Sequence, residues 1–260
     1  MSLFSLKNKI AIVTGGASGI GKAISLKFAS QGAHVFILEL NIKNTNELIL
    51  EVENTIGKIS FHQCNVSNSK EVENVINTII SKEKRIDILV NNAGIAHVGN
   101  IENTNEDDLD RLYQVNIKGV YNCIKSSITH MKSNQTGVIL NMASVASSIG
   151  VSDRFAYSMT KGAVLTMTYS IAKDYINDGV RCNCISPARI HTPFVDGFIN
   201  KNYPGKEKEM FEKLSKTQPI GRMGEPEEIA NLALFLCSNE AGFITGTNYP
   251  IDGGFIKLNT

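Results

Sequence analysis

The sequence of 260 residues has no excess of charge of either sign and no long apolar run. Its 26 basic and 25 acidic side chains leave a net charge of +1, whereas a nucleic-acid or membrane-surface protein shows a basic excess or a basic face. No stretch approaches the roughly 18–20 consecutive apolar residues of a membrane span. Residues 1–10 lack the apolar segment of a secretory signal. We therefore expect a cytoplasmic protein without nucleic-acid or membrane partners.

Paired cysteine and histidine spacings are also missing. The cysteines are Cys64, Cys123, Cys182, Cys184 and Cys237, scattered without a C-x-x-C pair. The histidines supply no paired ligand spacing either. We expect reduced, structural thiols and no metal site.

What the sequence does contain is a regular alternation of short apolar runs and helical patterns. Strands are predicted at Lys9–Thr14, Ala33–Glu39, Lys58–Cys64, Ile86–Asn91, Gly137–Asn141, Val180–Ile185 and Thr247–Pro250. Helices are predicted at Gly19–Gln31, Thr45–Ile56, Ser69–Ser81, Glu106–Met131, Phe155–Asn177 and Glu225–Ser238. Strands that are apolar on both faces and separated by helices are typical of a parallel sheet covered on both sides. With right-handed crossovers, residues 1–260 form a single α/β domain with a doubly wound layout.

The segment Pro187–Pro219 interrupts this alternation with prolines, glycines and clusters of Lys and Glu around scattered Phe, Ile and Met. We interpret it as a mobile excursion over a ligand crevice. An ordinary surface insertion is the alternative.

A glycine-rich turn follows the first predicted strand. Residues 14–21 read TGGASGIG, a G-x-x-x-G-x-G pattern that opens a helix. Glycines allow positive φ angles and the close approach of a pyrophosphate, and N–H groups at the helix start face that anion. The position of this turn on the first strand of a βαβ series therefore predicts a phosphate-binding loop.

Glu39 ends the second predicted strand, where a dinucleotide fold places an acidic group on the ribose hydroxyls. Its carboxylate repels a 2′-phosphate, and no arginine lies in residues 33–46 to attract one. We therefore expect NAD(H) rather than NADP(H). A solvated glutamate at a strand end is the alternative.

Tyr157 and Lys161 stand four residues apart in a predicted helix and therefore share one face. A phenol, with an ordinary pKa of about 10, is a poor base until a nearby ammonium stabilises its phenolate. Ser144 follows the fifth strand, and its hydroxyl can hold a substrate oxygen while the tyrosine passes the proton and hydride moves to or from nicotinamide. Taken singly, a Y-x-x-x-K pair is usually helix surface.

The sequence resembles the short-chain dehydrogenase/reductase family over essentially its whole length. The motifs that carry the resemblance are TGGASGIG at 14–21, NNAG at 91–94, Asn116, Ser144, YSMTK at 157–161, PARIHT at 187–192 and IDGG at 251–254. The resemblance implies a Rossmann-like fold, a homotetramer and a catalytic tetrad. In that tetrad Ser144 binds the reacting oxygen, and Tyr157 is the acid and base. Lys161 contacts the nicotinamide ribose and lowers the tyrosine pKa, and Asn116 holds a relay water.

The resemblance also implies which residues contact the cofactor. They are Gly15, Ser18, Gly19, Ile20, Gly21, Glu39, Leu40, Asn65, Val66, Asn92, Ala93, Gly94, Tyr157, Lys161, Pro187, Ile190 and Thr192. Two positions depart from the family pattern. Asn65 replaces the usual aspartate near the adenine, and Ala188 replaces the glycine that usually follows Pro187. Neither departure touches the tetrad.

The expected substrate-binding residues are Ser144, Tyr157, His97, Arg154 and Arg189. Residues 144–148, SVASS, followed by Arg154 resemble the human type of cytosolic 3-hydroxybutyrate dehydrogenase and related deoxy-sugar-acid dehydrogenases. In those relatives this arginine is associated with a substrate carboxylate. A guanidinium suits a carboxylate well. A surface role, or an ion pair with Asp153 or Asp196, is the alternative for each arginine.

We therefore hypothesise an oxidoreductase that acts on a small hydroxy or keto acid derived from a sugar. A neutral sugar or polyol, a 3-oxoacyl thioester, and a dinucleotide-binding regulator without turnover remain as alternatives. The predicted helices Glu106–Met131 and Phe155–Asn177 carry apolar residues on more than one face, as a helix-paired interface would.

Overall fold

The computed structural model describes residues 3–41, 48, 51–52 and 55–258. Its parallel strands form one sheet in the order β3-β2-β1-β4-β5-β6-β7. The strands are β1 (Ile10–Thr14), β2 (His34–Glu39), β3 (Lys58–Gln63), β4 (Ile88–Asn91), β5 (Gly137–Met142), β6 (Val180–Pro187) and β7 (Asn248–Ile251). Each strand predicted from the sequence is present.

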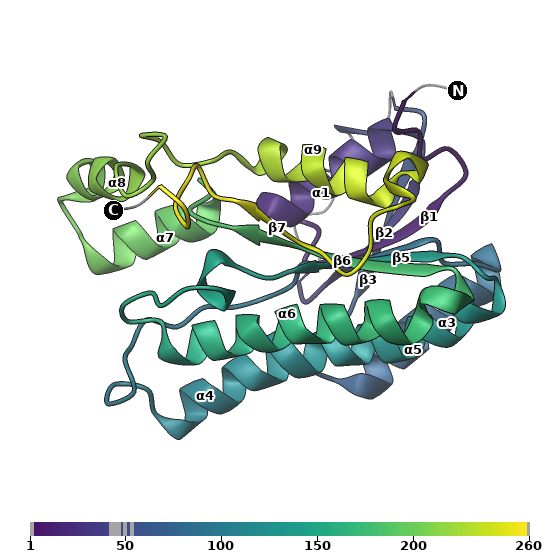
Figure 1. Ribbon diagram of the computed structural model, residues 1–260, viewed down its shortest axis with the longest axis horizontal. Helices are drawn as coiled ribbons and strands as arrows, with labels where there is room; N and C mark the ends of the chain where they lie inside the picture. Colours follow the sequence, from purple (N-terminus) through teal and green to yellow (C-terminus); the bar gives the residue numbers. More distant parts are fainter. Residues whose placement is uncertain (1–2, 42–47, 49–50, 53–54, 259–260) are drawn as a thin grey trace.

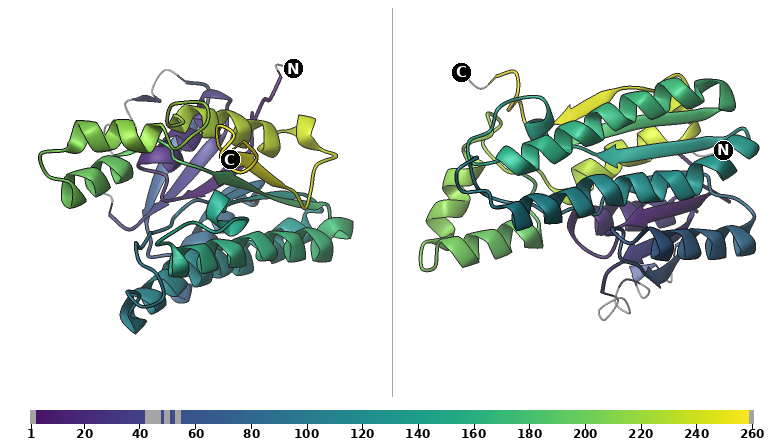
Figure 2. Two further views of the ribbon diagram at one scale, coloured as in Figure 1. Left: turned by 60° about the vertical axis from the view of Figure 1, so that its left-hand side comes forward. Right: turned by 90° about the horizontal axis from the view of Figure 1, so that it is seen from below.

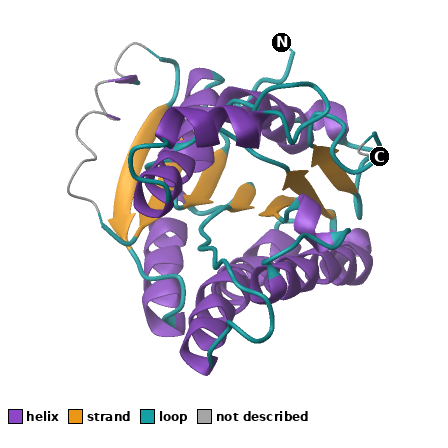
Figure 3. Cartoon of the chain, turned by 90° about the vertical axis from the view of Figure 1, so that its left-hand side faces the viewer, coloured by secondary structure: helices purple, strands orange, loops and turns teal. Residues whose placement is uncertain are grey.

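Helices cover both faces of the sheet (Figures 1 and 3). One face carries α1 (Gly19–Ser30) and α9 (Pro226–Cys237), and the other carries α3 (Ser69–Glu83), α5 (Gly119–Ser133) and α6 (Phe155–Tyr175). In β1, Ala11 and Val13 pack into the first core, whereas Ile10 and Ile12 pack into the second. Because successive side chains point to opposite faces, a strand buried on both sides has to be apolar throughout. The predicted doubly wound α/β fold is confirmed.

The order of the strands creates a switch point beside β1. The chain runs outward from β1 through β2 to β3 and then returns to β4 on the other side of β1. The connections that follow β1 and β4 therefore leave in opposite directions. Such a switch point opens a crevice beyond the carboxyl ends of the strands.

The predicted long helix Glu106–Met131 is interrupted. Helix α4 (Glu106–Leu112) continues into a π turn, η1 (Tyr113–Lys118), before α5 begins. π turns inside helices occur frequently at functional sites. This one carries Asn116.

The segment Pro187–Pro219 contains two helices, α7 (Pro193–Asn202) and α8 (Glu207–Ser215). They contact each other at one end of the molecule, beyond the carboxyl end of β6 (Figure 2). The predicted helix Thr45–Ile56 lies largely outside the described residues. None of the helices in the described part of the chain is long and apolar enough to cross a membrane.

Candidate active site

The turn after β1 is shaped by glycines and by one asparagine from the end of β4. Gly15 and Gly19 have φ angles of 61° and 50°, a region that residues with a side chain rarely adopt. A Cβ atom at Gly21 would lie 2.1 Å from the Gly15 carbonyl oxygen. Asn92 Nδ2 donates to the carbonyl oxygens of Thr14 and Gly15, both at 3.0 Å. The start of α1 therefore lies directly behind the turn, where its N–H groups favour an anion.

Glu39 contacts the same turn from the end of β2. Its Oε2 accepts a hydrogen bond from Ala17 N at 3.2 Å, and its Oε1 accepts one from Leu40 N at 3.1 Å. Ser18 is the N-cap residue of α1, yet its side chain makes no capping bond within the described turn. Its hydroxyl is therefore available to a ligand next to the Glu39 carboxylate.

Asn65 and Val66 follow β3 at the same edge of the sheet. Asn65 Oδ1 accepts hydrogen bonds from the Ser67 N–H at 3.0 Å and the Ser67 hydroxyl at 2.7 Å. Val66 is buried, and its carbonyl oxygen accepts a bond from Asn122 Nδ2 at 2.8 Å. The turn expected beside the adenine is thus ordered by Asn65 itself.

The remaining expected cofactor residues lie after β6. Pro187 ends the strand, and Ile190, 6% exposed, forms an isolated bridge with Gly224. Thr192 is the N-cap residue of α7, and its Cγ2 lies 3.3 Å from the place that a Cβ of Gly19 would take. The start of α7 therefore adjoins the glycine-rich turn.

Tyr157, Lys161 and Ser144 meet beyond the carboxyl end of β5. Lys161 lies one turn after Tyr157 on α6, and its Nζ is 5.8 Å from the centroid of the Tyr157 ring. Lys161 Nζ also donates to the Met142 carbonyl oxygen at 2.7 Å. Ser144 caps a short 3-10 turn, and its Oγ accepts a hydrogen bond from Ala146 N at 3.2 Å. The hydroxyl proton of Ser144 is therefore not used by this cap.

Burial sets the proton affinities of the pair on α6. It raises the pKa of the Tyr157 phenol, and a hydrogen bond with Ser144 and the charge of Arg154 lower that pKa in part. Burial also lowers the pKa of the Lys161 ammonium to about 8, because desolvation disfavours its charged form. That Lys161 lowers the tyrosine pKa stays a prediction. The ammonium is bound to the Met142 carbonyl, and burial dominates the pKa of the phenol.

Asn116 is 1% exposed, and its amide group is engaged on both sides. Its Oδ1 accepts a bond from Ile95 N at 2.9 Å, and its Nδ2 donates to Ile95 O at 2.9 Å and to Thr160 Oγ1 at 3.0 Å. This clamp joins the π turn to the loop after β4 and to α6. A Cβ on Gly94 would lie 3.3 Å from Asn116 Oδ1 and 3.6 Å from Lys161 Nζ. The expected tetrad is thus gathered around the loops that follow β4 and β5.

Arg154 is held at the start of α6 by the loop that follows NNAG. Gly99 N donates to Asp153 O at 3.0 Å, and Phe155 N donates to Gly99 O at 3.1 Å. The Arg154 guanidinium donates from Nη1 to the Asp153 carbonyl oxygen at 2.8 Å. The Asp153 carboxylate is not its partner.

Arg189 reaches the same region from the loop after β6. Its Nε donates to Thr217 Oγ1 at 3.1 Å. Burial lowers the pKa of Arg189, and the positive charge of Arg154 lowers it further. No ion pair joins either arginine to a carboxylate in the part of the chain that the structure describes. Asp196, the expected alternative partner, binds His191 at 3.1 Å.

His97 does not stand free at the mouth of the crevice. Its side chain is 14% exposed, and Nδ1 lies 3.6 Å from Asp108 Oδ2 on α4. The ring packs against Gly99, whose Cβ would lie 2.7 Å from His97 Nε2. That nitrogen is buried without a hydrogen-bond partner among the described residues.

Comparison with known proteins identifies the family. A sequence profile described as "Enoyl-(Acyl carrier protein) reductase" matches residues 15–256. Dehydrogenase/reductase SDR family member 6 of Aquarana catesbeiana is 39% identical over 252 residues, which cover 96% of this chain and 98% of that protein. This chain belongs to the short-chain dehydrogenase/reductase family.

Two further relatives illustrate the spread of activities within this family. The 3-oxoacyl-[acyl-carrier-protein] reductase FabG of Thermotoga maritima is 36% identical over 251 residues, covering 96% of this chain and 99% of that protein. The structure of Thermoplasma acidophilum aldohexose dehydrogenase (AldT) in ligand-free form matches with a TM-score of 0.87 at 35% identity, covering 96% of this chain and 95% of that one. As a member of the short-chain dehydrogenase/reductase family, the chain is an oxidoreductase of alcohol and ketone substrates that uses a nicotinamide dinucleotide.

The residues present fit such a dinucleotide. Gly15 and Gly19 turn the backbone with positive φ, the Ser18 side chain makes no capping bond in the described turn, and Glu39 faces the turn. The polar support of this cradle was not foreseen from the sequence. Thr14 Oγ1 accepts hydrogen bonds from the N–H groups of Asn92 and Ala93, both at 3.0 Å. The sequence feature that could have indicated this role is the position of Thr14 at the end of the first predicted strand.

Proposed function

We propose that the chain is an NAD(H)-dependent dehydrogenase/reductase of a small, carboxylate-bearing and sugar-derived hydroxy or keto acid, akin to the 3-hydroxybutyrate and deoxy-sugar-acid branch of the family. The observation that carries this proposal is the pair of neighbouring guanidinium groups, Arg154 and Arg189, which have no acidic partner among the described residues. Charges in a partly buried site are normally paired. A substrate carboxylate would supply the missing anion.

The protein groups divide the work of the reaction. The nicotinamide supplies or accepts the hydride when the cofactor is bound. Ser144 donates its hydroxyl proton to the substrate oxygen, and Tyr157 transfers a proton to or from that oxygen. Lys161, fixed by the Met142 carbonyl, supplies a positive charge near the phenol when protonated. Asn116 holds the π turn and the loop after β4 in place around this group.

The preference for NAD(H) rests on Glu39. Its carboxylate already lies against the glycine-rich turn, where it accepts the Ala17 N–H. From there it can accept hydrogen bonds from ribose hydroxyls, and it repels a 2′-phosphate. Of the proposed cofactor residues, Leu40 is 63% exposed beside it and brings no positive charge.

A test of the substrate class compares Arg154→Met with Arg111→Met, which removes an exposed arginine of α4 outside the crevice. We measure kcat/KM with both coenzymes on hydroxy acids, sugar acids, polyols and 3-oxoacyl thioesters. Loss of a hydrogen bond to a charged group costs about 1.5–3 kcal/mol, which is roughly 10- to 150-fold in kcat/KM. Arg154→Met should show this loss on the best acid and little change on neutral compounds, whereas Arg111→Met should resemble the wild type. An unchanged value for the best acid would contradict the proposal.

A second candidate is reduction of a 3-oxoacyl thioester. It is favoured by the similarity to the 3-oxoacyl-[acyl-carrier-protein] reductase of Thermotoga maritima and by the matching family profile. Neutral sugars are represented by the relative named as an aldohexose dehydrogenase. The same substrate panel separates these classes, and a complete absence of turnover would favour a regulator that only binds the dinucleotide.

We also propose a homotetramer. Tyr121 on α5 and Phe155 and Met159 on α6 are 53%, 45% and 41% exposed. These two helices lie side by side on one face of the sheet (Figures 1 and 2). Exposed large apolar groups on neighbouring helices are typical of a surface that pairs with another copy.

A further inference from the structure

A cavity of about 540 Å³ lies at the edge of the sheet opposite the active site. It is lined by the first residues of three strands, Ile88 of β4, Gly137 of β5 and Val180 of β6. The catalytic residues follow the other ends of these strands. Because the strands are parallel, the two sites are separated by the full length of the sheet. The volume falls in the range of small-molecule sites, roughly 300–1,000 Å³.

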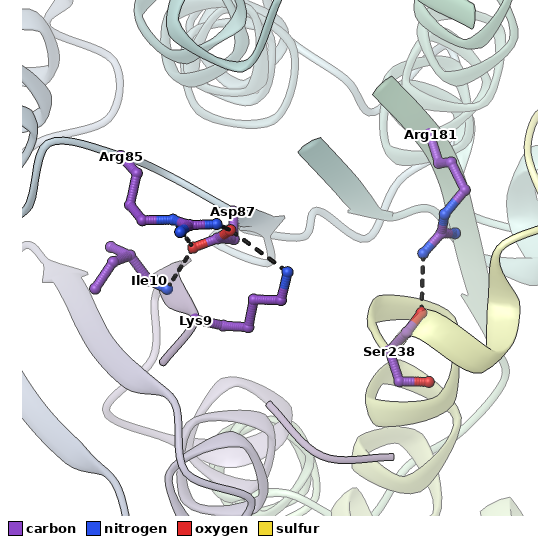
Figure 4. Close-up of polar contacts among 6 residues, drawn as sticks. All are labelled: Lys9, Ile10, Arg85, Asp87, Arg181 and Ser238. Carbon is purple, nitrogen blue, oxygen red and sulfur yellow. Dashed lines mark hydrogen bonds and ion pairs between the residues drawn. The ribbon is translucent and has the colours of Figure 1, made fainter. Parts of the chain in front are cut away.

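One wall of this cavity holds a lysine with unused hydrogen-bond donors. Asp87, 3% exposed, is bound by Arg85 through both carboxylate oxygens and accepts a bond from Ile10 N at 2.8 Å (Figure 4). Lys9 Nζ forms an ion pair with Asp87 Oδ1 at 3.6 Å, a separation longer than a hydrogen bond. The ammonium makes no hydrogen bond to any residue that the structure describes. Asp87 is therefore satisfied without Lys9.

Another wall holds Arg181, a half-buried guanidinium with no carboxylate partner in the described ranges. It donates from Nη1 to Ile244 O at 3.0 Å, and from Nη2 to Leu236 O at 2.9 Å and Ser238 O at 3.2 Å. Carbonyl groups at the end of α9 balance part of its charge. Two of its five N–H groups have no partner among the described residues. Figure 4 shows Arg181 across from Lys9 and Asp87.

The lining between these cations is apolar. Val138 is partly buried, Cys237 is buried, and Ile176 is 52% exposed at the rim. Phe243, also at the rim, is fully exposed. An aromatic ring that packs on nothing gains free energy when it covers an apolar ligand. The cavity thus combines an apolar body with two lining cations, Lys9 and Arg181, whereas its lining carboxylate, Asp87, is already bound by Arg85.

We propose that this cavity binds a small arylalkyl carboxylate, with the carboxylate between Lys9 and Arg181 and the aromatic ring between Phe243 and the apolar lining. A neutral ligand would leave the donors of Lys9 and Arg181 without an acceptor. A small hydrophilic anion would leave Phe243 and Ile176 in water. An amphipathic anion satisfies both conditions, and it binds independently of the cofactor and of the substrate.

The test is calorimetric titration of the full-length protein with 4-phenylbutyrate, compared with 4-phenylbutanol and acetate. A ligand of this size in a fitting site should bind with a dissociation constant of about 1 mM or below. Lys9→Met should weaken binding of the acid roughly tenfold, the scale of one charge-assisted hydrogen bond. Lys7→Met, an identical change on a neighbouring exposed lysine outside the cavity, should bind like the wild type. Phe243→Ser should weaken binding as well, and since the ring is fully exposed the variant should fold normally.

Arg154→Met distinguishes binding in the cavity from binding at the active-site arginines. If the acid binds in the cavity, this variant should give the same titration as the wild type. Loss of binding in Arg154→Met but not in Lys9→Met would overturn the proposal, as would equal affinity for the acid and the alcohol. Absence of binding by the wild type would overturn it too. Sedimentation of Phe243→Ser measures the mass of its assembly in solution. A lower assembly mass than the wild type would show that this face binds a second copy rather than a ligand.

Discussion

Gly21→Ala sets two physical effects against each other within the glycine-rich turn. Alanine in a helix is favoured over glycine by roughly 0.5–1 kcal/mol, so propensity alone predicts a more stable protein. The new Cβ, however, would lie 2.1 Å from the Gly15 carbonyl oxygen and 2.5 Å from Asn92 Nδ2. The backbone of the turn must move, and the two hydrogen bonds of Asn92 to Thr14 and Gly15 are strained or broken.

The steric effect should win. Each lost hydrogen bond costs about 0.5–1.5 kcal/mol, and overpacking costs roughly 1–3 kcal/mol more. With both bonds lost and the gain in helix propensity subtracted, we expect Gly21→Ala to lower the free energy of unfolding by about 1–5.5 kcal/mol and to weaken NADH binding. Thermal unfolding and NADH fluorescence titration measure the two effects.

The matched control for this prediction is Gly162→Ala on α6, where a Cβ meets nothing within 4 Å. At this position the substitution changes only the helix propensity, so the control should be as stable as the wild type or slightly more stable. If Gly21→Ala also matched the wild type in stability and in NADH affinity, the close packing assigned to the turn would be refuted.

Three further predictions concern charge and positioning. Burial lowers the pKa of Lys161 to about 8, so the protonated form of this side chain destabilises the fold below that pH. Without cofactor, Lys161→Met should therefore have a higher melting temperature than the wild type at pH 7. The difference should shrink as the pH rises from 8 towards 10.5, the ordinary pKa of lysine. A difference independent of pH would contradict this cause. Glu39→Gln should weaken NADH roughly tenfold and NADPH less, as fluorescence titration would show, and equal losses would remove Glu39 from coenzyme selection. Thr217→Val frees Arg189 and should raise KM for acids while kcat stays close to that of the wild type; a fall in kcat alone would argue against positioning.

The periodic parts of the fold could be predicted because their signals are local. The apolar strands and the helix between Glu225 and Ser238 were recognisable from pattern alone, and the latter is observed at Pro226–Cys237. The π turn at Tyr113–Lys118 was missed because one turn of altered hydrogen bonding leaves the helical pattern almost unchanged. The segment Pro187–Pro219 was interpreted as a mobile excursion because of its prolines, glycines and charged clusters. It contains helix α7, and Pro193 lies in the first turn of that helix, where proline is favoured.

The site was predictable as a set of residue types but not as an electrostatic environment. Spacing and motif placed Tyr157 and Lys161 on one helix face, which the structure confirms. The raised pKa of the phenol depends on burial by distant segments, which no local pattern records. The approach of Arg154 to Arg189 and the turning of His97 towards Asp108 likewise depend on how loops from different strands pack.

The central claim is that Tyr157 exchanges a proton with the substrate oxygen beside a bound nicotinamide dinucleotide. It is tested most directly by steady-state turnover of Tyr157→Phe on the best substrate, together with its affinity for NADH. Loss of a general acid and base costs roughly 10²- to 10⁴-fold in rate. We predict a fall of that size in kcat with NADH affinity unchanged. Turnover by the phenylalanine variant at the rate of the wild type would contradict the account.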